Sequence, residues 1–156
     1  MDTHQIELVR SSWALAGAEP ARVGALFYDT LFARDPSLRA MFRGDAAAQG
    51  LKLAQMIGAA VHMLDQAEVL VPVLQALADR HAGYGVKDEH YAVVGDALIE
   101  TLERGLGSDF TAPVRAAWLE TYRKMSEVMM AAGRRPEAAR APARSVFGHA
   151  AAAAML

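Results

Sequence analysis

One apolar helix that ends in a histidine constrains the fold of this chain more than any other feature. Leu70, Leu74, Leu77 and His81 follow one another at steps of four, three and four residues. This spacing places all four on one stripe of an α-helix that is otherwise apolar. From this stretch alone, the histidine fits either a buried core residue or a ligand to a metal or haem iron.

The residues that follow predict a sharp corner between two helices. Gly83 and Gly85 interrupt the first helix, and Asp88 is a good N-cap for a second helix that carries Tyr91 in its first turn. A neutral imidazole at such a corner can bond a backbone carbonyl through one nitrogen and direct the other into an apolar cavity. That arrangement is suited to a metal or haem-iron ligand.

The composition favours a single all-α domain. The chain has 156 residues, of which 53% are hydrophobic, and its Gly and Pro residues fall between periodic segments. No stretch alternates with the period of two that a half-buried β-strand requires. The periodicity predicts helices over about 3–16, 20–32, 36–42, 46–64, 67–81, 89–105 and 112–132. The predicted N-caps are Thr3, Asp35, Asp88 and Thr111. Pro72 is expected to be tolerated only in the first turn of its helix.

Charge and cysteine content exclude several classes of function. The formal net charge is -2, and no basic stripe precedes the tail, which argues against a partner that is a nucleic acid. The absence of cysteine excludes disulfides, thiol catalysis and thiolate metal sites. Without a signal-peptide pattern or a bilayer-length apolar run, we expect a cytoplasmic protein with no membrane segment.

Two polar positions and the end of the chain leave alternatives open. Tyr28 fits a half-buried phenol at a helix contact, and Gln49 fits either an exposed helix-start residue or a hydrogen-bond donor that faces a cavity. After residue 132 the composition shifts to Arg, Ala and Pro. We therefore expect a domain over residues 1–132 and a flexible or weakly helical tail over 133–156.

Four segments in this order resemble the globins. They read LFYDTLFARDPSLRAMF (26–42), ADRHAGYGV (78–86), HYAVVGDALIETL (90–102) and AWLETY (117–122). The likeness covers about residues 4–132, and these segments look like a bacterial single-domain globin, similar to the haem domain of flavohaemoglobins. It implies a globin fold, a three-over-three sandwich of helices around a b-type haem (iron protoporphyrin IX).

The resemblance also assigns roles to individual residues. It implies that His81 is the proximal ligand to the haem iron and that Tyr28 and Gln49 face the bound gas, beside Leu53. The haem contacts that it implies are Phe42, Leu53, Ile57, Leu77, His81, Val86 and Tyr91. Hydroxyl and amide donors in a water-poor pocket stabilise an oxygen ligand that carries partial negative charge.

The expected function is reversible binding of oxygen and of other diatomic ligands, nitric oxide and carbon monoxide among them, by a monomer or homodimer. Flavohaemoglobins carry a glutamate late in the last helix, where this chain reads Gly133-Arg134-Arg135-Pro136. No reductase domain follows residue 132, so any nitric oxide dioxygenase activity depends on an external reductase. Two alternatives stay open: a gas or redox sensor that signals through the arginine-rich tail, and a haem-free helical interaction module.

Overall fold

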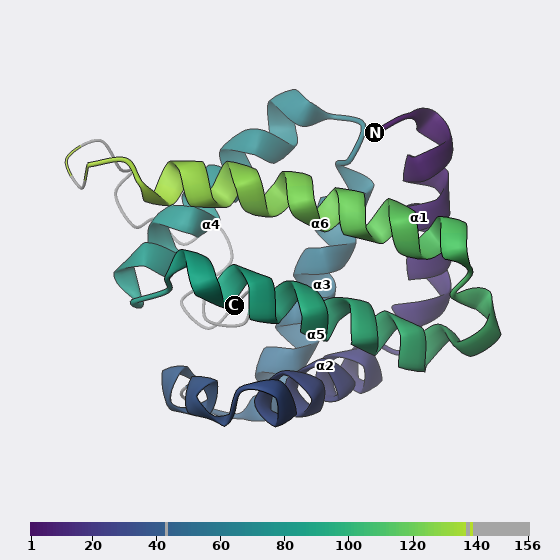
Figure 1. The fold of residues 1–156 in the computed structure, drawn as a ribbon, viewed down its shortest axis with the longest axis horizontal. Helices are drawn as coiled ribbons and strands as arrows, with labels where there is room; N and C mark the ends of the chain where they lie inside the picture. Colours follow the sequence, from purple (N-terminus) through teal and green to yellow (C-terminus); the bar gives the residue numbers. More distant parts are fainter. Residues whose placement is uncertain (43, 137, 139–156) are drawn as a thin grey trace.

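The computed structural model describes residues 1–42, 44–136 and 138, and within these ranges the chain is all-α, as predicted (Figure 1). The described residues form no β-strand. The helices are α1 (Thr3–Ala16), α2 (Pro20–Arg34), η1 (Pro36–Met41), α3 (Ala46–His62), α4 (Ala67–Gly83), α5 (Asp88–Leu106), η2 (Gly107–Asp109) and α6 (Ala112–Gly133), of which η1 and η2 are short 3-10 helices.

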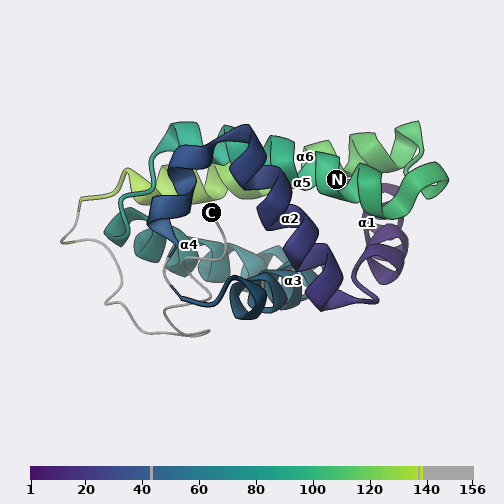
Figure 2. The same ribbon diagram turned by 90° about the horizontal axis from the view of Figure 1, so that it is seen from below.

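The helices pack in two layers. α5 and α6 run side by side, and α2 contacts α5 to complete one layer (Figures 1 and 2). α1, α3 and α4 lie on the opposite side in Figure 2 and form the other layer. The layers are joined where α2 contacts α3 and where α6 contacts α1 and α4. This is the three-over-three arrangement that the sequence resemblance implies.

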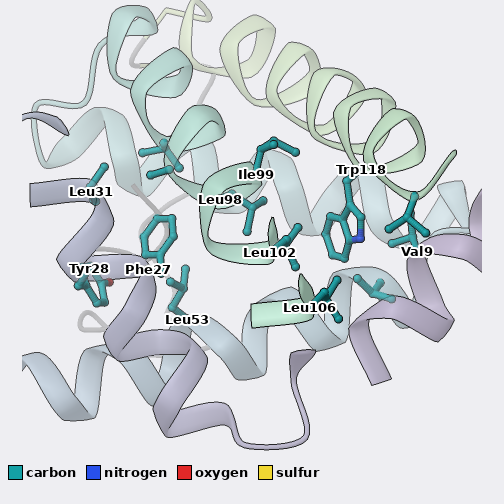
Figure 3. Close-up of a cluster of buried hydrophobic side chains, with 14 of the residues drawn as sticks. Val9, Phe27, Tyr28, Leu31, Leu53, Leu98, Ile99, Leu102, Leu106 and Trp118 are labelled. Carbon is teal, nitrogen blue, oxygen red and sulfur yellow. The ribbon is translucent and has the colours of Figure 1, made fainter. Parts of the chain in front are cut away.

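The larger apolar cluster lies between the layers and includes side chains of α1, α2, α3, α5 and α6 (Figure 3). Val9, Leu31, Leu102 and Trp118 are each at most 2% exposed. The buried indole of Trp118 donates a hydrogen bond from Nε1 to Ser12 Oγ at 2.9 Å. The one polar atom of this side chain is therefore satisfied, which keeps its burial from costing stability.

α2 and α3 approach each other closely because glycine faces glycine at their crossing. A Cβ added to Gly24 would lie 2.2 Å from the backbone oxygen of Gly50, far inside van der Waals contact. Tyr28 lies one turn after Gly24, and Gln49 directly precedes Gly50. The absence of two Cβ atoms therefore fixes the spacing between the helices that carry these two polar residues.

Two predicted N-caps are wrong by one residue. Thr3 is the first residue of α1, and its cap is Asp2, whose side chain accepts a bond from Gln5 N at 2.8 Å while the Gln5 side chain accepts from Asp2 N at 3.0 Å. This reciprocal pair satisfies two free donors at once. Asp88 likewise lies inside α5, and Lys87 precedes it as the cap. In the first turn the carboxylate of Asp88 still faces the positive end of the helix dipole.

The expectation for Pro72 is also wrong, because it is the sixth residue of α4 and lies beyond the first turn. Proline removes the backbone donor that would bond the carbonyl of Glu68. Both residues are exposed, so that carbonyl can be hydrated, and Leu70 and Leu74 on the same helix stay buried. Packing against α6 thus outweighs the lost hydrogen bond.

α6 ends at Gly133, next to the predicted end of the domain. Most of the predicted tail lies outside the described residues, so the division into 1–132 and 133–156 stays a prediction. Among the helices that the structure describes, none combines the length and the apolar character that crossing a bilayer requires.

Candidate functional site

His81 lies in the last turn of α4 and is 1% exposed. Its Nδ1 is 2.6 Å from the carbonyl oxygen of Leu77, one turn earlier in the helix. Because a carbonyl can only accept, Nδ1 is the protonated nitrogen and the lone pair of the neutral ring is on Nε2. The backbone therefore fixes both the tautomer and the orientation of the ring, as the sequence predicted.

The corner after His81 is closed by the backbone of the same residue. Its carbonyl oxygen accepts bonds from Tyr84 N at 3.1 Å and from Val86 N at 3.0 Å. Between these two donors, Gly85 takes a φ of +84°, a conformation that favours glycine. The turn brings the half-buried Val86 side chain against the larger apolar cluster.

Tyr91, in the first turn of α5, lies beside the histidine. The ring centroids of Tyr91 and His81 are 6.4 Å apart with an angle of 35° between the rings. Burial, assisted by the carboxylate of Asp88, raises the pKa of Tyr91 to about 12. The phenol is therefore neutral at physiological pH and can act as a hydrogen-bond donor.

Tyr122 holds this end of α5 against α6. Its hydroxyl donates to the backbone oxygen of Tyr91 at 2.5 Å. The ring is packed so closely on Gly95 that an added Cβ would lie 2.5 Å from Tyr122 Cε1. In the sequence, Tyr122 is the last residue of the segment AWLETY, and sequence reasoning missed this contact. No pattern of side chains could have revealed it, because the partner is a backbone carbonyl.

Two ion pairs join the end of α6 to α4, before the corner, and to α5, after it. Arg135 Nη2 is 3.0 Å from Asp79 Oδ1, and the Asp79 side chain is only 6% exposed. Arg134 Nη2 is 2.6 Å from Asp88 Oδ2. Where flavohaemoglobins are expected to carry a glutamate, this chain therefore supplies two cations that bind α4 and the start of α5.

The second group of predicted site residues surrounds Tyr28 on α2. The Tyr28 ring contacts Phe27, Phe32 and Phe42, with centroid separations of 5.3, 5.7 and 5.1 Å. Tyr28 is 3% exposed, and this burial raises the pKa of its phenol well above the ordinary value. The aromatic cluster thus fixes a neutral hydroxyl group on the α2 side of the fold.

Gln49 lies in the first turn of α3 and is buried, which excludes the exposed helix-start alternative. Its Nε2 lies 4.0 Å from the position that a Cβ on Gly44 would take, so the amide is directed toward the loop between η1 and α3. Leu53 is buried one turn later, and the half-buried Ile57 follows after another turn.

The predicted site residues divide between the two apolar clusters of the fold. Tyr28, Phe42, Leu53, Ile57 and Val86 belong to or pack against the larger cluster. Leu77 and Tyr91 belong with the smaller cluster between α4 and α6, which contains Met129 and Ala132. The structure thus groups His81 with Tyr91 in one part of the fold and Tyr28 with Phe42 in another. Among the described residues, no group of three or more His, Asp and Glu side chains is arranged to hold a bare metal ion.

Comparison with known proteins gives this arrangement a family. The Globin family model matches residues 25–129, which includes both groups of residues. The chain belongs to the globin family. The all-α three-over-three architecture is therefore a globin fold, and membership supports binding of haem and of a diatomic gas such as oxygen.

This globin is similar to proteins of two kinds. Neuroglobin-1 of Oncorhynchus mykiss is 32% identical over 130 residues, covering 74% of this chain and 82% of its relative. The flavohemoprotein of Bacillus cereus is 31% identical over 120 residues, covering 75% of this chain but only 29% of that protein. The flavohemoprotein of Vibrio cholerae is 27% identical over 128 residues, covering 80% and 32% respectively. The resemblance to flavohaemoglobin haem domains is thus confirmed, for the globin part of those proteins.

Proposed function

We propose that this globin holds haem b through Nε2 of His81 and binds oxygen and other small diatomic gases reversibly. One observation carries the proposal: His81 is buried, and its bond to the Leu77 carbonyl leaves the lone pair on Nε2. Ferrous haem, when bound to one imidazole, supplies an open coordination position for a gas. Phe42, Leu53, Ile57, Leu77, Val86 and Tyr91 are the apolar and aromatic contacts proposed to hold the macrocycle and exclude water.

Tyr28 and Gln49 are proposed to stabilise the bound gas by hydrogen bonding. Both are buried, and burial keeps the Tyr28 phenol protonated and able to donate. A hydrogen bond to a charged group contributes about 1.5–3 kcal/mol. Each donor would therefore slow release of oxygen by about 10- to 150-fold. Slow release suits storage or scavenging better than bulk transport.

Optical spectra of the purified protein test the haem proposal. We expect a Soret band in the ferric and dithionite-reduced protein and a further shift when the reduced protein meets oxygen. His81→Gly should lose haem or its five-coordinate spectrum, and added imidazole should restore it. His62→Ala is the matched control, because His62 is exposed at the end of α3. No haem uptake after reconstitution with hemin, or a normal spectrum for His81→Gly without imidazole, would overturn the proposal.

Nitric oxide detoxification is a second candidate, favoured by the similarity to flavohemoproteins. The balanced reaction consumes one nitric oxide, one dioxygen and one electron to give one nitrate. We propose that a flavin reductase delivers the electron. The stretch where the resemblance implies a proximal glutamate contains Arg134 and Arg135 instead, so we expect slow turnover. Nitric oxide consumption in the presence of oxygen and a flavin reductase tests this: consumption should require both, and its absence would leave gas binding alone.

A further inference from the structure

A second histidine holds the far end of the corner that follows His81. His90 is the third residue of α5, and its ring Nδ1 accepts a hydrogen bond from the backbone N of Lys87 at 2.9 Å. The backbone N of His90 donates in turn to the carbonyl oxygen of Lys87 at 3.0 Å. The imidazole therefore satisfies a donor at the start of α5 that has no partner within the helix.

The equivalent position of α1 carries a side chain that does not titrate. Gln5 is the third residue of α1, and its side-chain oxygen accepts from Asp2 N at 3.0 Å. An amide oxygen accepts at any pH, whereas an imidazole nitrogen accepts only while it carries no proton. Of these two helix starts, the one that follows the corner after His81 thus depends on a titratable acceptor.

Protonation of His90 opposes this cap in two ways. Both nitrogens of an imidazolium are donors, so the bond from Lys87 N is lost. The positive charge also lies in the first turn of α5, where the helix dipole disfavours a cation. The bond is therefore complete at alkaline pH and is lost as the pH falls, and histidine is the side chain that ordinarily titrates between about pH 5 and 8.

The charged groups around this turn do not replace the lost bond. Titratable or charged groups on the turn, and on the elements packed against this half of α5, are His81, Tyr84, Lys87, Asp88, Glu89, Tyr91, Arg34 of α2, and Tyr122 and Arg134 of α6. Asp88 is already paired with Arg134 at 2.6 Å. In the part of the chain that the structure describes, no carboxylate forms an ion pair with His90.

The backbone between the two histidines carries residues that are proposed to contact haem. Val86 N donates to the carbonyl oxygen of His81 at 3.0 Å, and the next amide, Lys87 N, donates to His90. Tyr91 follows His90 directly in the sequence. Without the bond at Lys87, the connection is held by His81 alone and the first turn of α5 can fray, which displaces Val86 and Tyr91.

We propose that His90 is a pH-responsive positioning residue, whose neutral ring holds the corner in the form that retains haem and whose protonation loosens it. The inference rests on the proposed function for its effect on haem, but the bond between His90 and Lys87 does not depend on haem. Because one hydrogen bond is lost, protonation of His90 should accelerate haem loss by about 2- to 12-fold.

Transfer of haem from the ferric protein to an excess of apomyoglobin measures the rate of haem loss. His90→Gln keeps an acceptor that does not titrate, as Gln5 provides in α1. Protonation of other groups, His81 included, accelerates haem loss in both proteins, so the ratio of their rates isolates His90. The rate of the wild type relative to His90→Gln should be close to 1 near pH 8 and about 2 to 12 near pH 5.5.

Two further variants sharpen the comparison. His90→Leu removes the acceptor and should lose haem faster than His90→Gln at both pH values. His4→Gln is the matched control, because His4 is exposed in the first turn of α1 and should leave the pH dependence of the wild type intact. Equal pH dependence in the wild type and His90→Gln would overturn the proposal.

NMR provides a readout that does not depend on haem loss. In the carbon monoxide complex, the ¹H–¹⁵N signal of Lys87 should move with pH in step with the ring signals of His90. It should stay in place in His90→Gln. If the protein takes up no haem, the proposed function fails, while the same titration of the haem-free chain still tests the cap. A Lys87 signal that does not follow His90 would reject the cap itself.

Discussion

The two sides of the proposed haem site are built by different physical means. On the His81 side, directional polar contacts hold α4, the following corner and α5 to α6: the Tyr122 hydroxyl on the Tyr91 carbonyl, and two arginines on Asp79 and Asp88. On the Tyr28 side, α2 meets α3 through glycine against glycine and meets the end of η1 through a cluster of four aromatic rings.

This difference shows that the fold uses one set of contacts to orient the imidazole of His81 and another to shape the side that is proposed to receive the gas. An imidazole that ligates iron must keep one orientation, and hydrogen bonds and ion pairs restrict orientation better than apolar contacts do. The side that receives the gas needs a dry space with a few donors, which close packing provides. Changes on the two sides should therefore have different signatures, and the predictions below are ordered by expected effect.

Gly24→Ala should have the largest effect, because the added Cβ meets backbone rather than a flexible side chain. We expect a loss of about 3 kcal/mol in the free energy of unfolding, measured by urea denaturation. Gly105→Ala is the control: no atom lies within 4 Å of its added Cβ, and it ought to be neutral or stabilising. Equal effects at the two positions would show that α2 and α3 are not held by this close approach.

Tyr28→Phe and Gln49→Leu should each accelerate oxygen dissociation by about 10- to 150-fold, the equivalent of one hydrogen bond to a charged group. Neither change removes the apolar packing, so haem content should stay close to that of the wild type. Stopped-flow displacement of oxygen by carbon monoxide measures the rate. If neither variant released oxygen faster, the proposed donors would have to be sought elsewhere.

Tyr122→Phe should remove the bond to the Tyr91 carbonyl and keep the ring packed on Gly95. We expect a loss of about 1 kcal/mol in the free energy of unfolding. The iron–histidine stretching frequency in resonance Raman spectra should also change, since Tyr91 lies beside His81. A loss of stability without any spectral change would limit Tyr122 to a structural role.

The ion pair between Arg135 and Asp79 should contribute less, about 0.5–1 kcal/mol, since the arginine side chain is partly exposed. A double-mutant cycle with Arg135→Gln and Asp79→Asn isolates the coupling energy. The coupling should diminish at high salt. Zero coupling at low salt would mean that this ion pair does not stabilise the helix that carries His81.

The smallest effect concerns the phenols of Tyr28 and Tyr91. Asp88→Asn should lower the pKa of Tyr91, because the Asp88 carboxylate adds to the effect of burial on that pKa. The pKa of Tyr28 should stay unchanged, because it is raised by burial alone. Since the folded pKa of Tyr91 exceeds its ordinary value of 10, its contribution to stability is complete below pH 10 and is lost as pH rises toward about 12. NMR of ¹³Cζ-labelled tyrosine measures both titrations. Equal changes in the pKa values of Tyr28 and Tyr91 on Asp88→Asn would contradict the expected difference between the two tyrosines.

Much of the helical structure around His81 could be predicted from the sequence, because it depends on residues that are neighbours in the chain. The stripe of Leu70, Leu74, Leu77 and His81 at helical spacing fixed one face of α4, and Gly85 fixed the corner. The N-caps of α1 and α5 were each misplaced by one residue, because the residue at which helical backbone conformation begins cannot be read from the residue types alone. Reciprocal side-chain bonds identify the cap of α1.

The sequence by itself determined the helices, because helical periodicity and local turn chemistry depend on neighbours in the chain. Through the resemblance of its segments it also indicated the family and the residues of the candidate site. Only the tertiary structure decided that Gly24 meets Gly50 and that Tyr122 bonds a carbonyl of α5. These contacts join residues far apart in the sequence through backbone atoms, and such contacts leave no pattern in the order of side chains.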